Sequence, residues 1–130
     1  MIDYQGLIND AIAVRENAYA PYSGFTVGAC LLTKSGKRFL GTNVENASYS
    51  LTSCAERNAL YSAVSSNERE PVAIAIVGGK DKIDDFTYPC GACRQVLFEL
   101  GGKELLIVLY NGKEQKILTL GELLPCVFEL

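Results

Sequence analysis

The chain has 130 residues, 48% of them hydrophobic, with a formal net charge of −3 at pH 7, five cysteines and no histidine. This length and apolar content predict one folded domain spanning residues 1–130 and exclude a disordered chain. Lysine and arginine are scattered without a basic stripe, so we expect no nucleic acid polymer as a partner. The longest apolar runs, 72–77 and 105–110, are too short to cross a membrane, and the N-terminus lacks signal-peptide features. We therefore expect a cytoplasmic protein without a membrane span.

The first part of the chain predicts a helix followed by a hairpin. Residues 3–19 place apolar side chains at helical spacing, and Ala-Pro-Tyr-Ser-Gly at 20–24 ends this pattern as a loop. Residues 25–33 and 38–43 have the composition of strands, and the Lys-Ser-Gly-Lys segment at 34–37 favours a hairpin turn between them. We therefore expect the sheet to begin with an antiparallel pair.

The second part of the chain predicts alternating helices and strands. In chain order these are a helix at 54–64, a buried strand at 72–77, a helix at 91–100, a buried strand at 105–110, a short strand at 114–118 and a helical turn at 120–124. This alternation favours an α/β layer architecture with parallel pairing in the second half. Together with the hairpin, it predicts a mixed sheet.

Three cysteines stand at the starts of predicted helices. Cys54 opens one helix, and the Cys90-Gly-Ala-Cys93 segment opens another. Free amide N–H groups and the helix dipole at such ends favour thiolate over thiol. If the two helix starts face each other, three thiolates can hold Zn²⁺ and leave its fourth tetrahedral position to water, as catalytic zinc requires. We read the other two cysteines, Cys30 and Cys126, as packing residues.

Two charged residues follow Cys54 closely. Zn²⁺ with three thiolates carries a formal charge of −1, which makes the metal a weaker Lewis acid toward water. We expect Arg57 to donate hydrogen bonds to the ligand sulfurs and to restore part of the metal's polarising power. A carboxylate must also accept a proton from the water, and in a chain without histidine Glu56 is the natural candidate.

The spacing of these residues matches a known signature. Cys54-Ala-Glu56, followed after thirty-two residues by Pro89-Cys90-Gly-Ala-Cys93, is the three-cysteine form of the zinc deaminase pattern. The chain resembles the cytidine deaminases. Residues 20–29 resemble that family's first substrate segment and residues 43–49 its ribose-binding segment, so the resemblance spans nearly the whole chain.

The resemblance implies a fold and an activity. The fold would be a three-layer α/β/α domain with a mixed five-stranded sheet. The reaction would be hydrolytic deamination of free cytidine and 2′-deoxycytidine in pyrimidine salvage, with one Zn²⁺ per subunit and Glu56 carrying protons from water to the base. The short three-cysteine branch forms homotetramers with shared active sites, so Tyr49 and Phe128 would reach a neighbouring subunit's substrate.

The same resemblance assigns contacts to the nucleoside. Asn43 and Glu45 would bind the ribose hydroxyls, and residues i and i+2 at the end of a strand do point to one face. An amide beside a carboxylate suits a sugar diol. Phe25 would pack on the pyrimidine, and the backbone N–H of Ala55 would donate to its 2-carbonyl oxygen.

Three other functions compete with this reading. A dithiol redox protein would use the CxxC segment alone and leaves Cys54 and Glu56 without a role. A zinc-stabilised binding module would need a fourth protein ligand, for which only Cys30 and Cys126 remain. A deaminase of a related aminopyrimidine, as a nucleoside or within a polynucleotide, would share the chemistry but differ in substrate.

Overall fold

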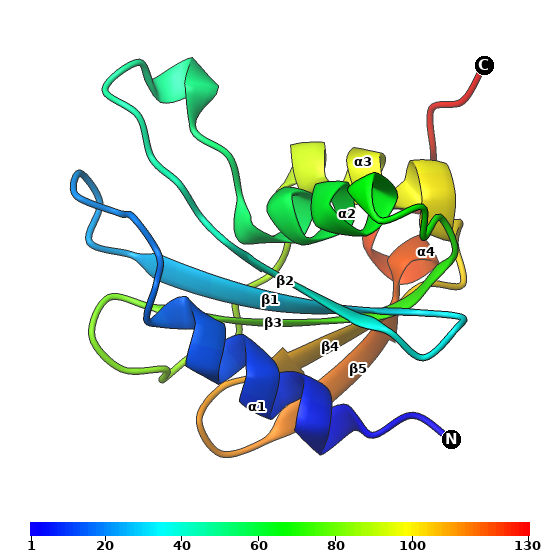
Figure 1. The fold of residues 1–130 in the computed structure, drawn as a ribbon, viewed down its shortest axis with the longest axis horizontal. Coiled ribbons are helices and arrows are strands. Elements are labelled where there is room, and N and C mark those ends of the chain that lie inside the picture. The colour runs from blue at the N-terminus through cyan, green and yellow to red at the C-terminus, as the bar shows by residue number, and fades with distance from the viewer.

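The computed structural model describes residues 1–130 and places a five-stranded sheet between helices on both faces (Figure 1). The strands are β1 (Thr26–Thr33), β2 (Arg38–Thr42), β3 (Pro71–Gly79), β4 (Leu106–Tyr110) and β5 (Gln115–Thr119), in the spatial order β2-β1-β3-β4-β5. The helices are α1 (Tyr4–Arg15), η1 (Tyr49–Leu51), α2 (Ala55–Ser65), α3 (Gly91–Gly101) and α4 (Leu120–Leu123). The predicted three-layer α/β/α fold with a mixed sheet is confirmed.

One pair of strands is parallel and the other three pairs are antiparallel. β3 and β4 run parallel across the connection that contains α3, whereas β1 pairs antiparallel with β2 and β3. The expected parallel pairing in the second half does not extend to β5, which pairs antiparallel with β4. The short turn between them explains this, because Gly112 adopts a φ of 95° and Asn111 Oδ1 accepts from the Lys113 and Glu114 N–H groups.

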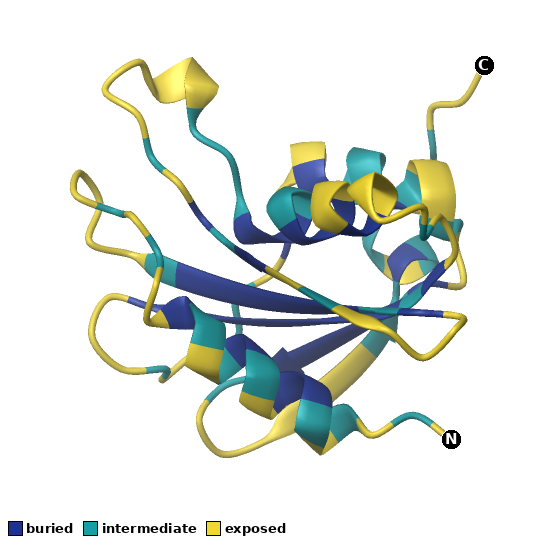
Figure 2. Ribbon diagram, viewed as in Figure 1, coloured by how far each residue is buried: buried dark blue, intermediate teal, exposed yellow.

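The core has two halves, one on each face of the sheet (Figure 2). Alternate residues of β3 divide between them, since Ala73 and Ala75 pack toward α1 while Ile74 and Ile76 pack toward α2 and α3. Burial on both faces is why this strand reads as a continuous apolar run. No helix of the chain combines the length and apolar character needed to span a membrane.

The first helix ends at Arg15, four residues before the sequence pattern predicts. Beyond it, Tyr19 forms a parallel bridge with Val44, and the Tyr19 N–H donates to the Asn43 carbonyl at 3.1 Å. The buried Arg15 side chain donates to three backbone carbonyls, one of them that of Thr26 at 3.0 Å. These contacts to distant segments stop the helix, although apolar side chains continue at helical spacing.

Helix α2 lies unusually close to β2. A Cβ atom on Gly41 would collide with the Ala55 carbonyl oxygen and the Ala59 nitrogen, so only glycine lets the first turn of α2 approach the strand this closely. The start of α2 therefore sits directly over the end of β2, where the chain continues into the segment that contains Asn43 and Glu45.

Candidate active site

The three cysteines singled out from the sequence converge. Cys54 is the N-cap of α2, Cys90 is the N-cap of α3, and Cys93 lies in the first turn of α3. Their Sγ atoms all lie within 4.8 Å of one another, and those of Cys54 and Cys90 are 4.0 Å apart. Neither N-cap side chain accepts a capping hydrogen bond, so both helix starts turn uncapped N–H groups and positive dipole ends toward the sulfur cluster.

The sulfurs are crowded enough to share protons. The pKa of Cys54 falls to about 5, chiefly because its sulfur accepts a hydrogen bond from Cys93 and also from Arg57. The pKa of Cys93 is raised because its thiol is hydrogen-bonded to Cys54 and buried. A divalent cation replaces such shared protons and allows all three sulfurs to ionise, so the donor set fits a thiolate-bound metal.

Arg57 reaches the cluster as predicted. Its Nη2 donates to Cys54 Sγ at 3.3 Å, whereas its Nε is buried without a hydrogen-bond partner. Buried donors are rarely left unpaired, so this N–H without a partner, on a guanidinium that contacts the Cys54 sulfur, is an independent sign that a negatively charged group belongs nearby.

Glu56 is buried beside the sulfurs. Its residue exposure is 4%, and burial raises the pKa of its carboxyl to about 7, with the neighbouring Cys54 thiolate adding to the rise. A carboxyl with this pKa occurs in both protonation states near neutral pH, as a group that accepts and returns protons requires.

Asn43 is also buried, and its side-chain amide forms hydrogen bonds with the backbone. Its Oδ1 accepts from the Val27 N–H at 2.9 Å, and its Nδ2 donates to the Phe25 carbonyl at 2.8 Å. The side chain therefore fixes the start of β1 against the end of β2. One N–H of the amide and the second acceptor direction of Oδ1 are left for a ligand.

Glu45 lines a cavity of about 380 Å³ together with Tyr22, Ser23, Tyr49 and Thr52. Its Oε1 accepts from the Tyr22 and Ser23 N–H groups at 2.9 and 3.1 Å, and its Oε2 accepts from the Ser23 hydroxyl. These bonds, the hydroxyl first, lower the pKa of the Glu45 carboxyl, which is ionised at neutral pH.

Asn58 links the end of β2 to the residue before Cys54, and the sequence motifs did not single it out. Its Nδ2 donates to the Thr42 carbonyl at 2.7 Å, and its Oδ1 accepts from the Ser53 hydroxyl at 2.8 Å. Beside it, Val44 and Ser53 exchange backbone hydrogen bonds of 2.9 and 3.0 Å. The available signal was an asparagine in a helix interior, which is unfavourable unless its amide has tertiary partners.

The two predicted base contacts come from different elements, the segment before β1 and the start of α2. Phe25 is 36% exposed, and a Cβ on Gly78 would come within 3.0 Å of its ring and 2.7 Å of Thr87 Oγ1, so the ring lies close to the β3 backbone. Ala55 is the first residue of α2, and its N–H belongs to the helix end that has no intrahelical partner.

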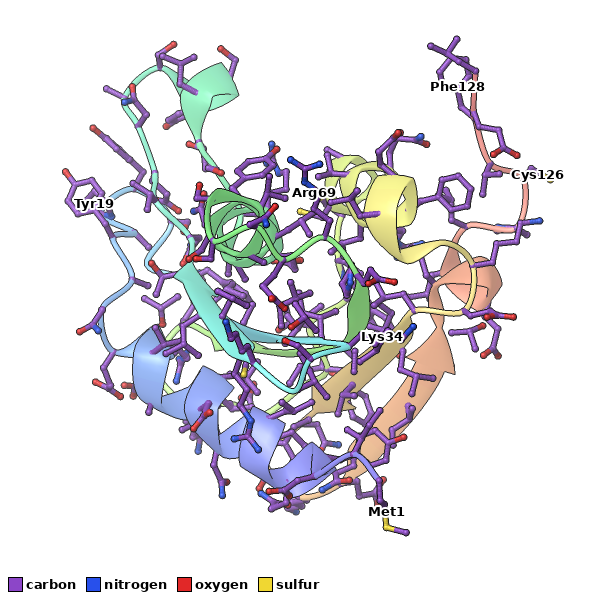
Figure 3. All side chains as sticks on the ribbon, turned by 45° about the vertical axis from the view of Figure 1, so that its right-hand side comes forward. Met1, Tyr19, Lys34, Arg69, Cys126 and Phe128 are labelled. Atoms are coloured by element: carbon purple, nitrogen blue, oxygen red, sulfur yellow. The ribbon has the colours of Figure 1, made fainter.

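Tyr49 and Phe128 are exposed aromatic residues outside the sulfur cluster of their own chain, although Tyr49 lines the same cavity as Glu45. They are 74% and 68% exposed. Tyr49 on η1 packs edge-on against Tyr22 with ring centroids 6.0 Å apart, and Phe128 lies on the C-terminal tail, well away from the sheet (Figure 3). Neither side chain contributes to the sulfur cluster of its own chain.

The remaining cysteines do not join the cluster. Cys30 is fully buried among the residues on the α1 face of the sheet, which confirms its packing role. Cys126 is exposed on the same tail as Phe128, so the packing role predicted for it is wrong within this chain, because the tail leaves the core (Figure 3). The metal group therefore has three protein ligands, and the closed zinc module is not supported.

Comparisons with known proteins agree with this site. The model of the cytidine and deoxycytidylate deaminase zinc-binding region matches residues 1–109. The cytidine deaminase of Halalkalibacterium halodurans is 50% identical over 129 residues, which cover 98% of this chain and 95% of the relative. The crystal structure of cytidine deaminase from Burkholderia pseudomallei superimposes with a TM-score of 0.90 at 50% identity, covering 98% of this chain and 100% of that chain. The corresponding Mycobacterium tuberculosis structure gives 0.86 at 41% identity, with 100% of both chains covered. The chain therefore belongs to the cytidine and deoxycytidylate deaminase family, with Cys54, Cys90 and Cys93 as its zinc-binding group.

Proposed function

We propose that this chain catalyses the zinc-dependent hydrolytic deamination of cytidine and 2′-deoxycytidine to uridine and 2′-deoxyuridine, with release of ammonia. The observation that carries the proposal is the placement of the buried Glu56 carboxyl beside three convergent sulfurs that have no fourth protein ligand. When bound there, zinc supplies Lewis-acid chemistry that makes water acidic near neutral pH. The family and the relatives named above support this activity.

Glu56 moves the protons of this reaction. As the oxygen of water adds to C4 of the base, the carboxylate takes a proton from that water and delivers it to N3. The carboxyl then passes the second water proton to the amino group on C4, which leaves as ammonia. A pKa of about 7 lets one carboxyl act as base and then as acid at neutral pH.

Asn43 and Glu45 contact the ribose hydroxyls. The Asn43 amide keeps one N–H and the second acceptor direction of Oδ1, and the Glu45 carboxylate keeps one acceptor direction on Oε2. These free donor and acceptor groups suit sugar hydroxyls, which both donate and accept.

The base contacts complete the site. Phe25 packs on the pyrimidine ring, and the Ala55 N–H, held at the start of α2, donates to the 2-carbonyl oxygen. Arg57 keeps Cys54 in its thiolate form through the 3.3 Å hydrogen bond to its sulfur. Ala55 and Arg57 belong to the first turn of α2, and Phe25 directly precedes β1.

The activity has a direct test. Ultraviolet absorbance should report loss of cytidine and of 2′-deoxycytidine by the purified protein, with one zinc bound per chain. A zinc-loaded protein that leaves both nucleosides unchanged would contradict the proposal. A metal-free preparation that cycles between a Cys90–Cys93 disulfide and dithiol would support the redox alternative instead.

We further propose a homotetramer in which Tyr49 and Phe128 contact substrate in neighbouring subunits. Support comes from the exposed apolar residues concentrated on the projecting segments, which are Tyr19, Tyr22, Val44, Tyr49, Leu51 and Phe128. Sedimentation should give a mass about four times 14.1 kDa. Phe128→Ala should raise the KM for cytidine, and a monomeric mass would contradict the shared site.

We also assign the protein to the cytoplasm and to pyrimidine salvage. All five cysteines are free, and a zinc site made only of thiolates needs surroundings that keep thiols reduced. Growth of a pyrimidine-requiring strain on cytidine, dependent on this chain, would test the salvage role.

A further inference from the structure

One serine connects the sugar-binding and base-binding segments. The Ser23 hydroxyl donates to Glu45 Oε2 and accepts from the Phe25 N–H at 2.9 Å. The Ser23 N–H also donates to Glu45 Oε1 at 3.1 Å, next to the Tyr22 N–H at 2.9 Å. Three of these hydrogen bonds join the loop before β1 to Glu45, which follows β2, and the fourth lies within the loop.

The direction of these bonds is fixed by counting protons. A hydroxyl has a single proton, and an N–H can only donate, so the Ser23 oxygen receives the Phe25 N–H and sends its own proton to the carboxylate. The two backbone N–H groups hold Oε1, and the hydroxyl holds Oε2. Without the hydroxyl, only Oε1 of the carboxylate is held by hydrogen bonds. The carboxylate can then rotate about the Cγ–Cδ bond and turn the free acceptor direction of Oε2 away from the cavity.

We propose that Ser23 is a positioning residue that holds the Glu45 carboxylate in the orientation in which it accepts a sugar hydroxyl of the nucleoside. This inference rests on the proposed function, since it assumes that Glu45 contacts the sugar. The Ser23 side chain is exposed and carries no core packing, so its removal changes the orientation of Glu45 without removing an apolar contact.

The chain contains a matched control. Ser35 is also an exposed serine whose hydroxyl donates to a glutamate, Glu68, at 2.6 Å. It lies in the turn after β1, at the opposite end of that strand from Phe25. Ser35→Ala thus removes the same kind of hydrogen bond from the same kind of surface, away from the site.

Steady-state kinetics provide the test. For Ser23→Ala we expect the KM for cytidine and for 2′-deoxycytidine to rise about threefold to tenfold, with kcat within about twofold of wild type. Calorimetric binding of uridine, which involves no turnover, should weaken by the same factor. Ser23→Thr keeps the hydroxyl and should restore the wild-type values, and Ser35→Ala should match wild type.

A double variant shows whether Ser23 acts through Glu45. In a Glu45→Ala background, Ser23→Ala should leave KM unchanged, because no carboxylate remains to be oriented. If the increases in KM of the two single variants multiply in the double variant, the inference is overturned. A KM for Ser23→Ala equal to that of wild type, or a loss confined to kcat, would also overturn it. Inactivity of the wild-type enzyme on cytidine would instead overturn the proposed function, on which the inference depends.

Discussion

Replacing Glu56 by glutamine separates the chemistry of this carboxyl from its effect on stability. Gln has nearly the same shape but cannot exchange a proton at neutral pH. In the zinc-loaded enzyme we expect kcat for cytidine to fall by about 10²- to 10⁴-fold, which is the usual contribution of a positioned acid–base group. Zinc content should stay at one per chain, because Glu56 is not among the three sulfur ligands.

The same substitution should stabilise the metal-free protein at neutral pH. Burial raises the pKa of Glu56 from 4.5 to about 7, so the folded state binds this proton more tightly than the unfolded state. Stability from this group is therefore fully present below pH 4.5 and is lost as the pH rises through 7. A rise of this size corresponds to about 3 kcal/mol, and glutamine does not titrate over this range.

The assay is urea unfolding of both metal-free proteins between pH 5 and pH 8. All other titrating groups are shared, so the difference in the free energy of unfolding isolates Glu56. It should grow in favour of Glu56→Gln as the pH rises, by about 2 to 3 kcal/mol across this range. A difference that does not change with pH, or a zinc-loaded variant that keeps more than a tenth of wild-type kcat, would refute the reasoning.

Three further perturbations test other parts of the site and core. Chelation of zinc should abolish deamination and lower the melting temperature, and added Zn²⁺ should restore both, as absorbance assays and thermal scans can follow. Arg57→Gln should lower activity or zinc affinity by about 10- to 100-fold, because it removes the hydrogen bond to a ligand sulfur, and competition with a chromogenic chelator will report the affinity. Leu97→Ala should cost about 2 to 5 kcal/mol of unfolding free energy in urea, since Leu97 is fully buried, while leaving zinc content unchanged.

Local sequence patterns predict most of this fold because the apolar pattern of each element matches the way that element packs in the structure. The apolar run at 72–77 predicts a strand buried on both faces, and β3 packs α1 on one side and α2 on the other. The tight spacing in CxE and PCxxC predicts the metal group, since each motif opens a helix and the folding of one sheet brings both helix starts together. The helical spacing of apolar residues predicts too long a first helix. The chain leaves the helix after Arg15, and Tyr19 forms a bridge with Val44, which is distant in the sequence.

The partners of polar side chains are harder to predict. The sequence places Asn43 and Glu45 on one face but cannot show that the asparagine amide is already bonded to Val27 and Phe25. Those partners lie on another strand, and a hydrogen bond between strands depends on register rather than on local composition. Which donor and acceptor groups are left free for a ligand follows only from the three-dimensional structure.

The start of α2 contacts both the metal group and the segment proposed to bind the sugar. Gly41 lets this helix start rest on β2, and Asn58 ties Thr42, at the end of that strand, to Ser53, the residue before the first metal ligand. A shift of α2 would therefore move Cys54 and Glu56 together with the segment proposed to bind the sugar. In the proposed function, C4 of the base lies near the metal and the sugar lies against Asn43 and Glu45. This shared attachment then keeps the separation between the two contacts constant, as effective orientation of a reactant requires.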